Sequence, residues 1–282
     1  MPKGRRLSGS RRARAPLRAV VYLQYARCAF QRRAAYRLAN WTGIAVNFFF
    51  FLLHAQVYLA FFRDRTMPSG WRAEDAVLYF ATSEALMMTL AVFPDRLEPL
   101  SERIRTGQVT TDLARPVDLY LRDLGERYGN ALYFLLTRTT VLYAGALLVF
   151  PIAPSWQPAL AWLPLSLLLA VAVSGTLWYL ANAMAFWTEH AHGPIFVMVH
   201  FFAIFGGALI PLDFYPDWLR WLSDALPFRA ALYTPVALAT GKLAGASLAF
   251  GLVHQVVWLA LLVAAARGVE ARGVRRLVLH GG

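Results

Sequence analysis

Long apolar segments are the feature that most constrains what this chain can fold into. An α-helix needs about 20 mainly apolar residues to cross about 30 Å of hydrocarbon. Because a bilayer offers no water to backbone N–H and C=O groups, such segments are expected to be helical. The sequence therefore predicts an all-α integral membrane protein with six transmembrane helices, at residues 41–62, 75–93, 130–150, 158–187, 194–210 and 243–266.

Composition excludes the main soluble classes. Hydrophobic residues make up 58% of the chain and charged residues 16%, yet the net charge is +12. A soluble nucleic-acid-binding protein can carry such a charge, but it needs far more polar surface. A disordered chain is excluded for the same reason. The single cysteine, Cys28, cannot form an internal disulfide. The positive charge is therefore expected to lie outside the bilayer.

The positions of Lys and Arg orient the chain, because cytoplasmic loops of membrane proteins are enriched in them. Residues 1–40 carry eleven, residues 95–129 carry six, and the tail from Arg267 carries four, which makes 21 on one side of a six-span topology. The other side carries six, and Arg138 lies inside a span. Both termini are therefore predicted to be cytoplasmic.

Three regions are expected along the chain: a basic cytoplasmic N-terminus over 1–40, a single six-span domain over 41–267, and a short basic tail over 268–282. Residues 17–38 mix apolar and basic side chains, which is typical of a helix lying along an anionic membrane surface. The first apolar run begins only at Trp41 and is long enough to span, so it does not resemble a signal peptide. An interfacial elbow helix is therefore predicted before the first span.

The inside segment 94–129 is predicted to have structure of its own. Leu97, Leu100 and Ile104 share one face of a short helix, and Gly107 follows where a C-cap would fall. The segment carries six basic and seven acidic residues, so it is close to neutral. It is interpreted either as a solvated loop or as a docking element for a cytoplasmic partner.

The outside segment 211–242 is predicted to form a re-entrant or interfacial helical hairpin. Prolines interrupt any continuous helix, and tryptophans at this density favour the headgroup layer. Broken backbone at this depth must be buried in protein or line a polar cavity. The residues taken to define the hairpin are Pro211, Asp213, Pro216, Trp218, Trp221 and Pro227.

Two motifs then give the chain a resemblance to a known family. One is Glu102-Arg103-Ile104-Arg105-Thr106-Gly107, followed by Asp112-Leu113-Ala114-Arg115-Pro116-Val117. The other runs from Phe205-Gly206-Gly207 through Ile210-Pro211-Leu212-Asp213 to Leu219, with Leu226-Pro227-Phe228 after it. Placed on the inside and outside loops, they make residues 18–267 resemble an ABC-2-type permease, the membrane subunit of ATP-driven exporters, and the short bacterial members in particular.

The resemblance implies partners and a location. A cytoplasmic ABC ATPase dimer would dock on the inside segment, which would act as a coupling helix between spans 2 and 3. A second permease subunit, identical or related, would complete a dimer in a bacterial cell membrane, and no nucleic acid is expected. The sequence has no G-x-x-x-x-G-K-[ST] phosphate loop, so ATP and Mg would be bound by the partner. The residues implied in ATPase contact are Leu97, Glu98, Leu100, Ser101, Glu102, Ile104, Arg105 and Gly107.

Polar and small residues within the spans are further candidates. Glu84 and Arg138 each cost about 2.5–3.5 kcal/mol in hydrocarbon, so they are expected either to pair, to snorkel or to line the substrate path. Gly206 and Gly207 precede the hairpin and are candidates for a helix bend or a permease–permease interface.

Two other classes of function stay open at this stage. A stand-alone ion-coupled transporter would need acidic residues near the midplane, and Glu84 is the clear candidate. An integral membrane enzyme, such as a protease or lipid transferase, is less expected because no catalytic cluster or HExxH motif is present. His190 and His192 give too few ligands for a zinc site, so neither a metal nor a cofactor bound by this chain is expected. The substrate stays unidentified.

Overall fold

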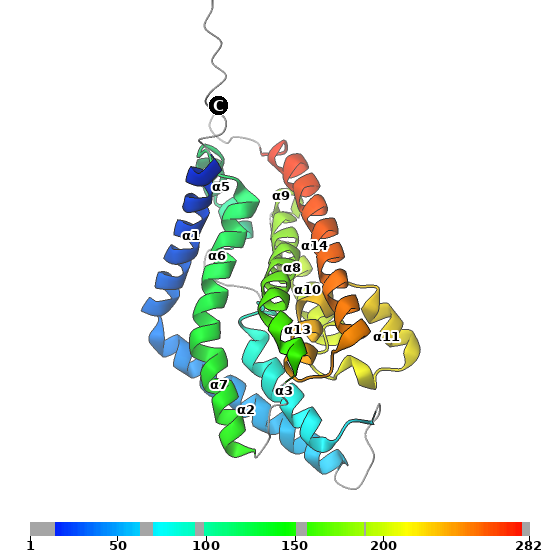
Figure 1. The fold of residues 1–282 in the computed structure, drawn as a ribbon. Helices are drawn as coiled ribbons and strands as arrows, with labels where there is room; N and C mark the ends of the chain where they lie inside the picture. Colours follow the sequence, from blue (N-terminus) through cyan, green and yellow to red (C-terminus); the bar gives the residue numbers. More distant parts are fainter. Residues whose placement is uncertain (1–14, 63–69, 94–98, 151–156, 189, 278–282) are drawn as a thin grey trace, which may run out of the picture.

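A computed structural model describes residues 15–62, 70–93, 99–150, 157–188 and 190–277 of the protein. These residues form α-helices, short 3₁₀ and π-helical turns, and connecting turns, with no β-strand among them (Figure 1). The prediction of an all-α fold is therefore confirmed. Residues 1–14 and 278–282 of the predicted terminal regions lie outside the described residues.

Four helices are long and apolar enough to cross a membrane, at Leu38–Ala60, Leu119–Val149, Pro158–Thr188 and Gly245–Val274. The first lies in α2 (Arg37–Phe62) and the last is α14 (Gly245–Val274). The second joins α6 (Leu119–Phe134), the π-helical turn η3 (Leu135–Thr139) and α7 (Thr140–Val149). The third joins the 3₁₀ turn η4 (Pro158–Trp162), α8 (Leu163–Ala183) and α9 (Ala185–Thr188). These four correspond to the predicted spans 41–62, 130–150, 158–187 and 243–266.

The other two predicted spans fall on shorter helices. Span 75–93 corresponds to α3 (Ala73–Met87, 15 residues), and span 194–210 to α10 (His192–Phe205, 14 residues). At 1.5 Å per residue, these helices are about 21–22 Å long, less than the hydrocarbon thickness. The six-span count therefore stays a prediction.

Both short helices end in turns whose carbonyl groups are hydrogen-bonded by aromatic side chains. After α3, Ala91 has a φ of 50° and its carbonyl accepts a bond from Trp178 Nε1 at 2.5 Å. After α10, Gly207 has a φ of 77°, and its carbonyl accepts a bond from the Tyr79 hydroxyl at 2.8 Å. Non-helical backbone is tolerated at membrane depth only where it is buried and satisfied in this way.

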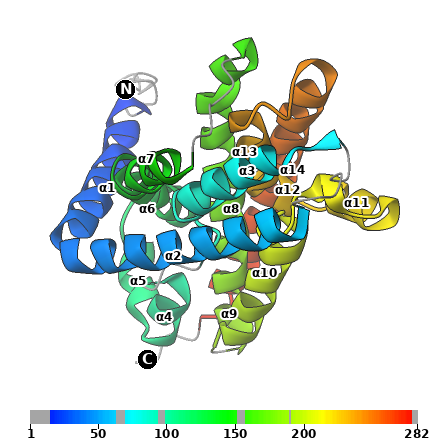
Figure 2. The same cartoon turned by 90° about the horizontal axis from the view of Figure 1, so that it is seen from below.

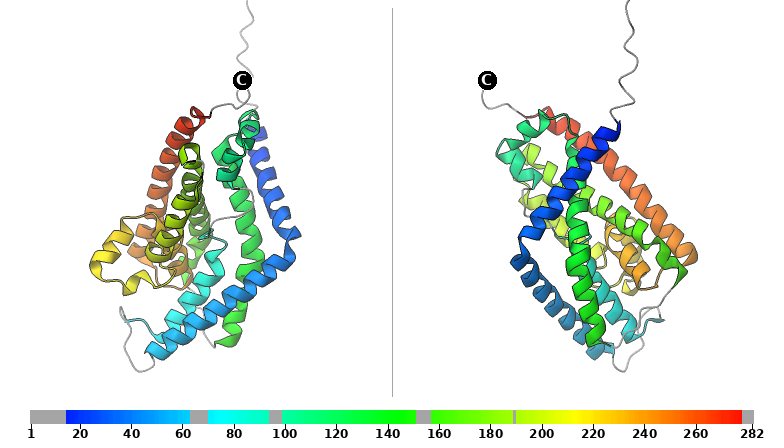
Figure 3. Two further views of the ribbon diagram at one scale, coloured as in Figure 1. Left: turned by 180° about the vertical axis from the view of Figure 1, so that it is seen from behind. Right: turned by 60° about the vertical axis from the view of Figure 1, so that its left-hand side comes forward.

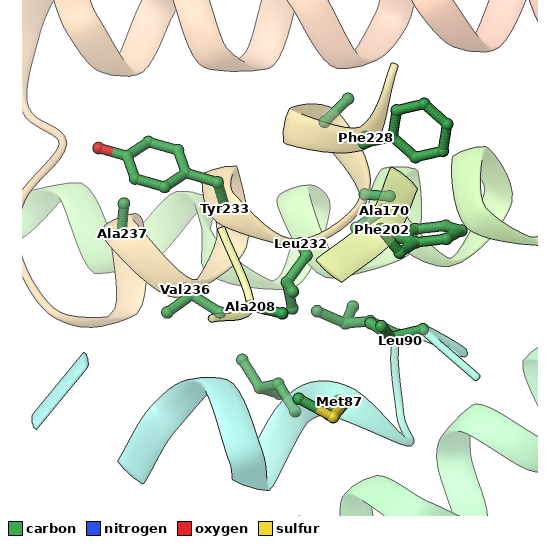
Figure 4. Close-up of a cluster of buried hydrophobic side chains, with 14 of the residues drawn as sticks. Met87, Leu90, Ala170, Phe202, Ala208, Phe228, Leu232, Tyr233, Val236 and Ala237 are labelled. Carbon is green, nitrogen blue, oxygen red and sulfur yellow. The ribbon is translucent and has the colours of Figure 1, made fainter. Parts of the chain in front are cut away.

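The main core lies between α3, α8, α10 and two short helices, α12 (Phe228–Ala231) and α13 (Tyr233–Ala239). Figure 4 shows Phe202 and Phe228 meeting above Leu232, with Leu90 and Met87 below them. Phe202 stacks on Trp178 at 5.7 Å between ring centroids and meets Phe228 edge-on at 5.2 Å. The turn after α3 is therefore packed directly into the centre of the molecule.

Helix α1 (Ala15–Ala35) occupies the segment expected to be an elbow helix, and Tyr36 separates it from α2 (Figure 3). It packs along the first half of α6, where Gly125 and Gly129 face its backbone. A Cβ on Gly129 would overlap the carbonyl of Ala26, and one on Gly125 would lie 3.0 Å from the carbonyl oxygen of Tyr22. These two glycines, four residues apart, permit the close approach that small residues give to membrane helices.

Two groups of short helices connect the longer ones. The first, α4 (Leu100–Arg105) and α5 (Gln108–Leu113), sits at the end of the bundle where α1 and α6 begin and α14 ends (Figure 1). We call this the α4–α5 end. The second comprises the 3₁₀ turn η5 (Leu212–Phe214), α11 (Asp217–Asp224), α12 and α13. Helix α11 projects from the side of the bundle (Figure 2).

Candidate functional site

The α4–α5 pair is anchored to several long helices through one buried cluster. Leu100 and Val109 pack with residues from the start of α6 and the ends of α8 and α14, and Ile104 lies against the same cluster. The other buried members are Leu119, Tyr120, Tyr179, Ala183 and Ala266. A force applied to α4 or α5 would therefore act directly on three of the four long apolar helices.

The outer side of the pair is polar and exposed. Glu102 and Arg105 are three residues apart on α4, and both side chains are 48% exposed. The Arg105 guanidinium donates two hydrogen bonds to the Glu102 carboxylate, at 2.5 and 2.9 Å, and holds the pKa of that carboxyl below its ordinary value. Gly107, with a φ of 75°, forms the tight turn between α4 and α5. The exposed surface continues to Gln108.

Polar contacts fix the pair against the bundle. Asp112 of α5 lies between two arginines, Arg103 of α4 and Arg122 of α6, and forms ion pairs with both. The Ser101 hydroxyl donates a 2.7 Å hydrogen bond to Oδ1 of Asn182 on α8. Because all three ionic side chains are at most 14% exposed, this network is only weakly accessible to solvent.

The structure thus divides the eight residues implied in ATPase contact. Glu102, Arg105 and Gly107 are exposed, whereas Leu100, Ser101 and Ile104 face the bundle. Leu97 and Glu98 lie outside the described residues. The helix begins at Leu100 because Pro99 occupies its N-cap position.

A cavity of about 390 Å³ lies between α2, α3 and α10, and we call it the Glu84 cavity. Glu84 of α3 and His54 of α2 are its ionisable lining residues, and His54 Nδ1 lies 3.4 Å from Glu84 Oε1. Glu84 is 6% exposed, and the other lining residues are mainly apolar, including Val199 in the middle of α10 and Leu209 just after its end. A mainly apolar wall with a few polar groups is the usual lining of a ligand pocket.

Arg138 lies elsewhere, so the structure does not bring the two charged span residues together. Its side chain lines a second cavity, of about 690 Å³, together with Arg33, Arg127 and Asn130. We call this the arginine cavity. Arg138 is 7% exposed, and among the described residues it forms no ion pair. The two cavities have Val46 and Phe93 as common lining residues, so they adjoin.

The predicted hairpin residues fall on η5, α11 and their connections. Trp218 and Trp221 are 68% and 72% exposed on α11. Asp213 accepts a 2.6 Å hydrogen bond from the hydroxyl of Tyr233 and lies 3.7 Å from Arg220. The three prolines Pro211, Pro216 and Pro227 stand at the N-cap positions of η5, α11 and α12. The exposed tryptophans are therefore carried by an element that is tied back to the core.

The helix-bend candidates, Gly206 and Gly207, immediately follow the last residue of α10. Gly207 adopts the left-handed backbone conformation that other residues rarely adopt. A Cβ there would lie 2.8 Å from the Tyr79 hydroxyl. The chain turns away from the α10 axis at this point, while a role at a permease–permease interface stays a prediction.

Sequence reasoning did not single out several residues that line these cavities. These are His54 in the Glu84 cavity and Arg33, Arg127 and Asn130 in the arginine cavity. Their convergence depends on the rotation and tilt of α1, α2 and α6, which hydropathy does not report. The Gly-x-x-x-Gly spacing of Gly125 and Gly129 was the one available signal that α1 and α6 are in close contact.

Comparison with known proteins identifies the family. No curated protein matches this chain. The family model described as ABC-2 family transporter protein matches residues 44–281, which is most of the chain. The predicted resemblance is thereby confirmed. Members of this family are multi-pass membrane subunits that work with ABC ATPases. The chain belongs to the ABC-2 transporter family, and it is a membrane permease of ABC-type transport.

Proposed function

We propose that this protein is the permease subunit of an ATP-binding cassette exporter. It would form the translocation path and couple that path to ATP hydrolysis by a separate ATPase subunit, which would bind the ATP and Mg. The observation that carries the proposal is the α4–α5 pair, which is exposed on one side and anchored to α6, α8 and α14 on the other. A coupling element requires both properties.

Coupling would proceed through the buried side of this pair. The ATPase dimer would contact Glu102, Arg105 and Gly107, and closure of that dimer would displace α4 and α5. Leu100 and Ile104, packed on the ends of the long helices, would transmit the displacement. The Asp112 ion pairs and the Ser101–Asn182 hydrogen bond would make α4 and α5 move as one body with the start of α6 and the end of α8.

The Glu84 cavity is the proposed translocation path. It lies beside α3 and α10, the two helices that are too short to span alone, and each is followed by a turn with a buried residue, Leu90 after α3 and Ala208 after α10. Counting these two as crossing segments gives the six spans of the predicted topology. A second permease subunit, identical or related, would supply the wall of the path that this subunit does not form.

The proposed orientation has both termini in the cytoplasm of a bacterial cell. The start of α1, the α4–α5 pair and the end of α14 lie at one end of the molecule, as this topology requires (Figure 1). Helix α1 would be an elbow helix at the cytoplasmic surface. Exposed Trp218 and Trp221 on α11 would lie in the opposite headgroup layer, where tryptophan is favoured.

The single cysteine tests this orientation without engineering, because Cys28 is exposed on α1. A membrane-impermeant maleimide should label it in inverted vesicles and not in intact spheroplasts. As a matched control, Trp221→Cys in a Cys28→Ser background should give the reverse result. Labelling of Cys28 from outside would reject the topology.

Docking is tested by purification of the tagged permease from its native cells. We expect an ABC ATPase to co-purify, and Glu102→Arg to lower its recovery by about tenfold, the equivalent of about 1.4 kcal/mol. Asp217→Arg, at an exposed position on α11, is the matched control and should leave recovery unchanged. Equal recovery with both variants would refute docking through α4.

Membership in the family does not favour the stand-alone ion-coupled transporter or the membrane enzyme. The contact between buried Glu84 and partly buried His54 is the feature that an ion-coupled mechanism would use. Proteoliposomes separate the alternatives: transport that requires ATP and the partner ATPase supports the exporter. Transport driven by an ion gradient, with this chain as the only protein, would contradict it.

A further inference from the structure

The Glu84 cavity contains an acidic side chain that has no Lys or Arg beside it. Glu84 is 6% exposed, and none of the described lining residues is Lys or Arg. His54 Nδ1 lies 3.4 Å from Glu84 Oε1, but this nitrogen has no hydrogen-bond partner among the described residues. The His54 ring is held there by stacking on Phe80, at 5.5 Å between ring centroids. The Glu84 carboxylate therefore keeps its capacity to pair with a cation.

Three helices build the walls around this carboxylate. On α2, Val46, Phe50 and His54 are spaced four residues apart, which places them on one face of the helix. Helix α3 contributes Glu84, and α10 contributes Ala203. Apart from Glu84, His54 and one asparagine, the described lining residues are apolar. The cavity thus combines one acidic group with extended apolar walls.

The cavity lies within the hydrocarbon layer rather than at a membrane surface. Val46 and His54 are about 12 Å apart along the α2 axis. Val46 is eight residues after the start of the apolar segment Leu38–Ala60, and His54 is six residues before its end. Ionisable groups at this depth are expensive and are typical of substrate paths. A cation that pairs with the Glu84 carboxylate stabilises its ionised form, so binding releases any proton that the empty site holds.

The walls decide which kind of cation fits. One carboxylate and one imidazole are too few ligands for a metal ion, and the described residues contain no group of three candidate ligands. A compact ammonium ion is strongly hydrated, so it would lose much of its solvation among apolar walls. Phe50 and Phe93 add aromatic rings, which attract cations. A large organic cation, whose charge is surrounded by apolar groups, therefore suits the cavity best.

We propose that the Glu84 cavity binds lipophilic organic cations, and that such cations are the substrate class of the transport path. The second part rests on the function proposed above, whereas binding is a property of the purified permease and can be measured without the ATPase. Anionic amphiphiles of the same size would be rejected, because they would meet the Glu84 carboxylate in a medium that screens charge poorly.

Equilibrium dialysis of the full-length, detergent-purified protein tests the site with two probes of matched shape. Tetraphenylphosphonium and tetraphenylborate have nearly the same size and opposite charges. We expect tetraphenylphosphonium to bind at least about tenfold more tightly, because a single charge contact in a desolvated site supplies about 1.4 kcal/mol or more. Equal binding of the two probes would show that the cavity is merely apolar and would refute the proposal.

A competition experiment separates an organic cation from an inorganic one. Sodium chloride should displace tetraphenylphosphonium no more than N-methylglucamine chloride does at the same ionic strength, since a buried contact is screened little by salt. Stronger displacement by sodium would assign the carboxylate to an inorganic ion and overturn the proposal.

Variants locate the binding. Glu84→Gln keeps the size of the side chain and should abolish the preference for the cation, while Glu84→Asp should retain part of it. Glu74→Gln is the matched control: it lies on the same helix, its side chain is 68% exposed, and it should bind like the wild type. If Glu84→Gln does not yield a monodisperse protein, Ala203→Phe tests the cavity by filling it. An unchanged preference in folded Glu84→Gln, or unchanged affinity in folded Ala203→Phe, would reject the site.

This inference and the exporter function fail in different ways. ATP-dependent transport by the assembled complex, without selective binding of tetraphenylphosphonium to the permease, would reject the cation site alone. Selective binding that depends on Glu84, without any ATP-dependent transport by the complex, would keep the site and reject the exporter function.

Discussion

The hydrogen bond from Tyr79 to Gly207 offers a quantitative test of how the turn after α10 is held. Tyr79→Phe removes one oxygen and leaves a ring that keeps its edge-on contact with Trp71, at 5.7 Å between centroids. Tyr79 is fully buried, so no water replaces the lost donor to the Gly207 carbonyl. The variant therefore isolates a single buried hydrogen bond.

Two known ranges bear on how far Tyr79→Phe should lower the free energy of unfolding. An unsatisfied buried carbonyl costs about 1–3 kcal/mol in soluble proteins. Hydrogen bonds in membrane proteins average about 0.6 kcal/mol, with a maximum near 1.7, because the unfolded chain in the membrane also finds partners. Since the Gly207 carbonyl lies outside α10 and has no helical N–H donor to replace the tyrosine, we expect a value near the upper limit, about 1.5 kcal/mol.

The assay is reversible unfolding in mixed micelles titrated with sodium dodecyl sulfate, followed by tryptophan fluorescence. Tyr215→Phe is the control, because it removes a similar 2.6 Å bond to the Ile204 carbonyl at a partly exposed position. Its cost should be below about 0.5 kcal/mol. Gly207→Ala should lower the free energy of unfolding by more than Tyr79→Phe. Its Cβ would collide with the Tyr79 hydroxyl, and alanine would also be strained at a positive φ. If both tyrosine variants have the same unfolding free energy, the turn is not held by Tyr79.

The same unfolding assay checks three further expectations. Gly129→Leu should separate α1 from α6 and cost about 1–3 kcal/mol, because even a Cβ overlaps the Ala26 carbonyl; a neutral result would mean that α1 is not packed there. Asp112→Asn should cost about 2–3 kcal/mol, between the values for exposed and buried ion pairs, and 0.5 M salt should change this difference little because the network is largely buried. Trp178→Phe leaves the Ala91 carbonyl without its indole donor, so we expect a loss of at least about 1 kcal/mol, and emission of the folded protein should shift to the red because a fully buried tryptophan is removed.

Most of the helical architecture follows from hydropathy, because a long apolar run has only one way to satisfy its backbone in lipid. The run that contains α14 was predicted at 243–266, and the helix extends from Gly245 to Val274. The extra turns at its end carry Glu270 and Arg272, whose charges made the sequence look like a tail. Charge marks the membrane boundary, but it does not end a helix.

The short helices were harder to predict for a physical reason. The turn after α3 contains Thr89, Leu90 and Ala91, which are as apolar as a helix would be, because this turn is itself buried. Hydropathy therefore cannot separate it from the helix that precedes it. After α10, Gly206 and Gly207 gave a visible signal for a bend, since glycine tolerates positive φ.

Side-chain partners could be predicted only in part. The face of α4 formed by Leu100 and Ile104 was identified from spacing alone, and both residues do pack on the bundle. The partner of Glu84 was not identifiable in this way. Glu84 meets His54 on α2 rather than Arg138, because the relative rotation of two helices sets which of their polar groups face each other.

The π-helical turn at Leu135–Thr139 has a consequence for how relatives of this protein diverge. A π-turn is an α-helix with one residue inserted, and the insertion rotates everything beyond it by about 100°. Arg138 lies within that turn, so its direction depends on the insertion. A relative one residue shorter here would keep an unbroken helix and the same apolar composition, yet its arginine would point away from Gly43. In an alignment, a single-residue gap at this position therefore separates chains in which this arginine faces Gly43 from chains in which it does not.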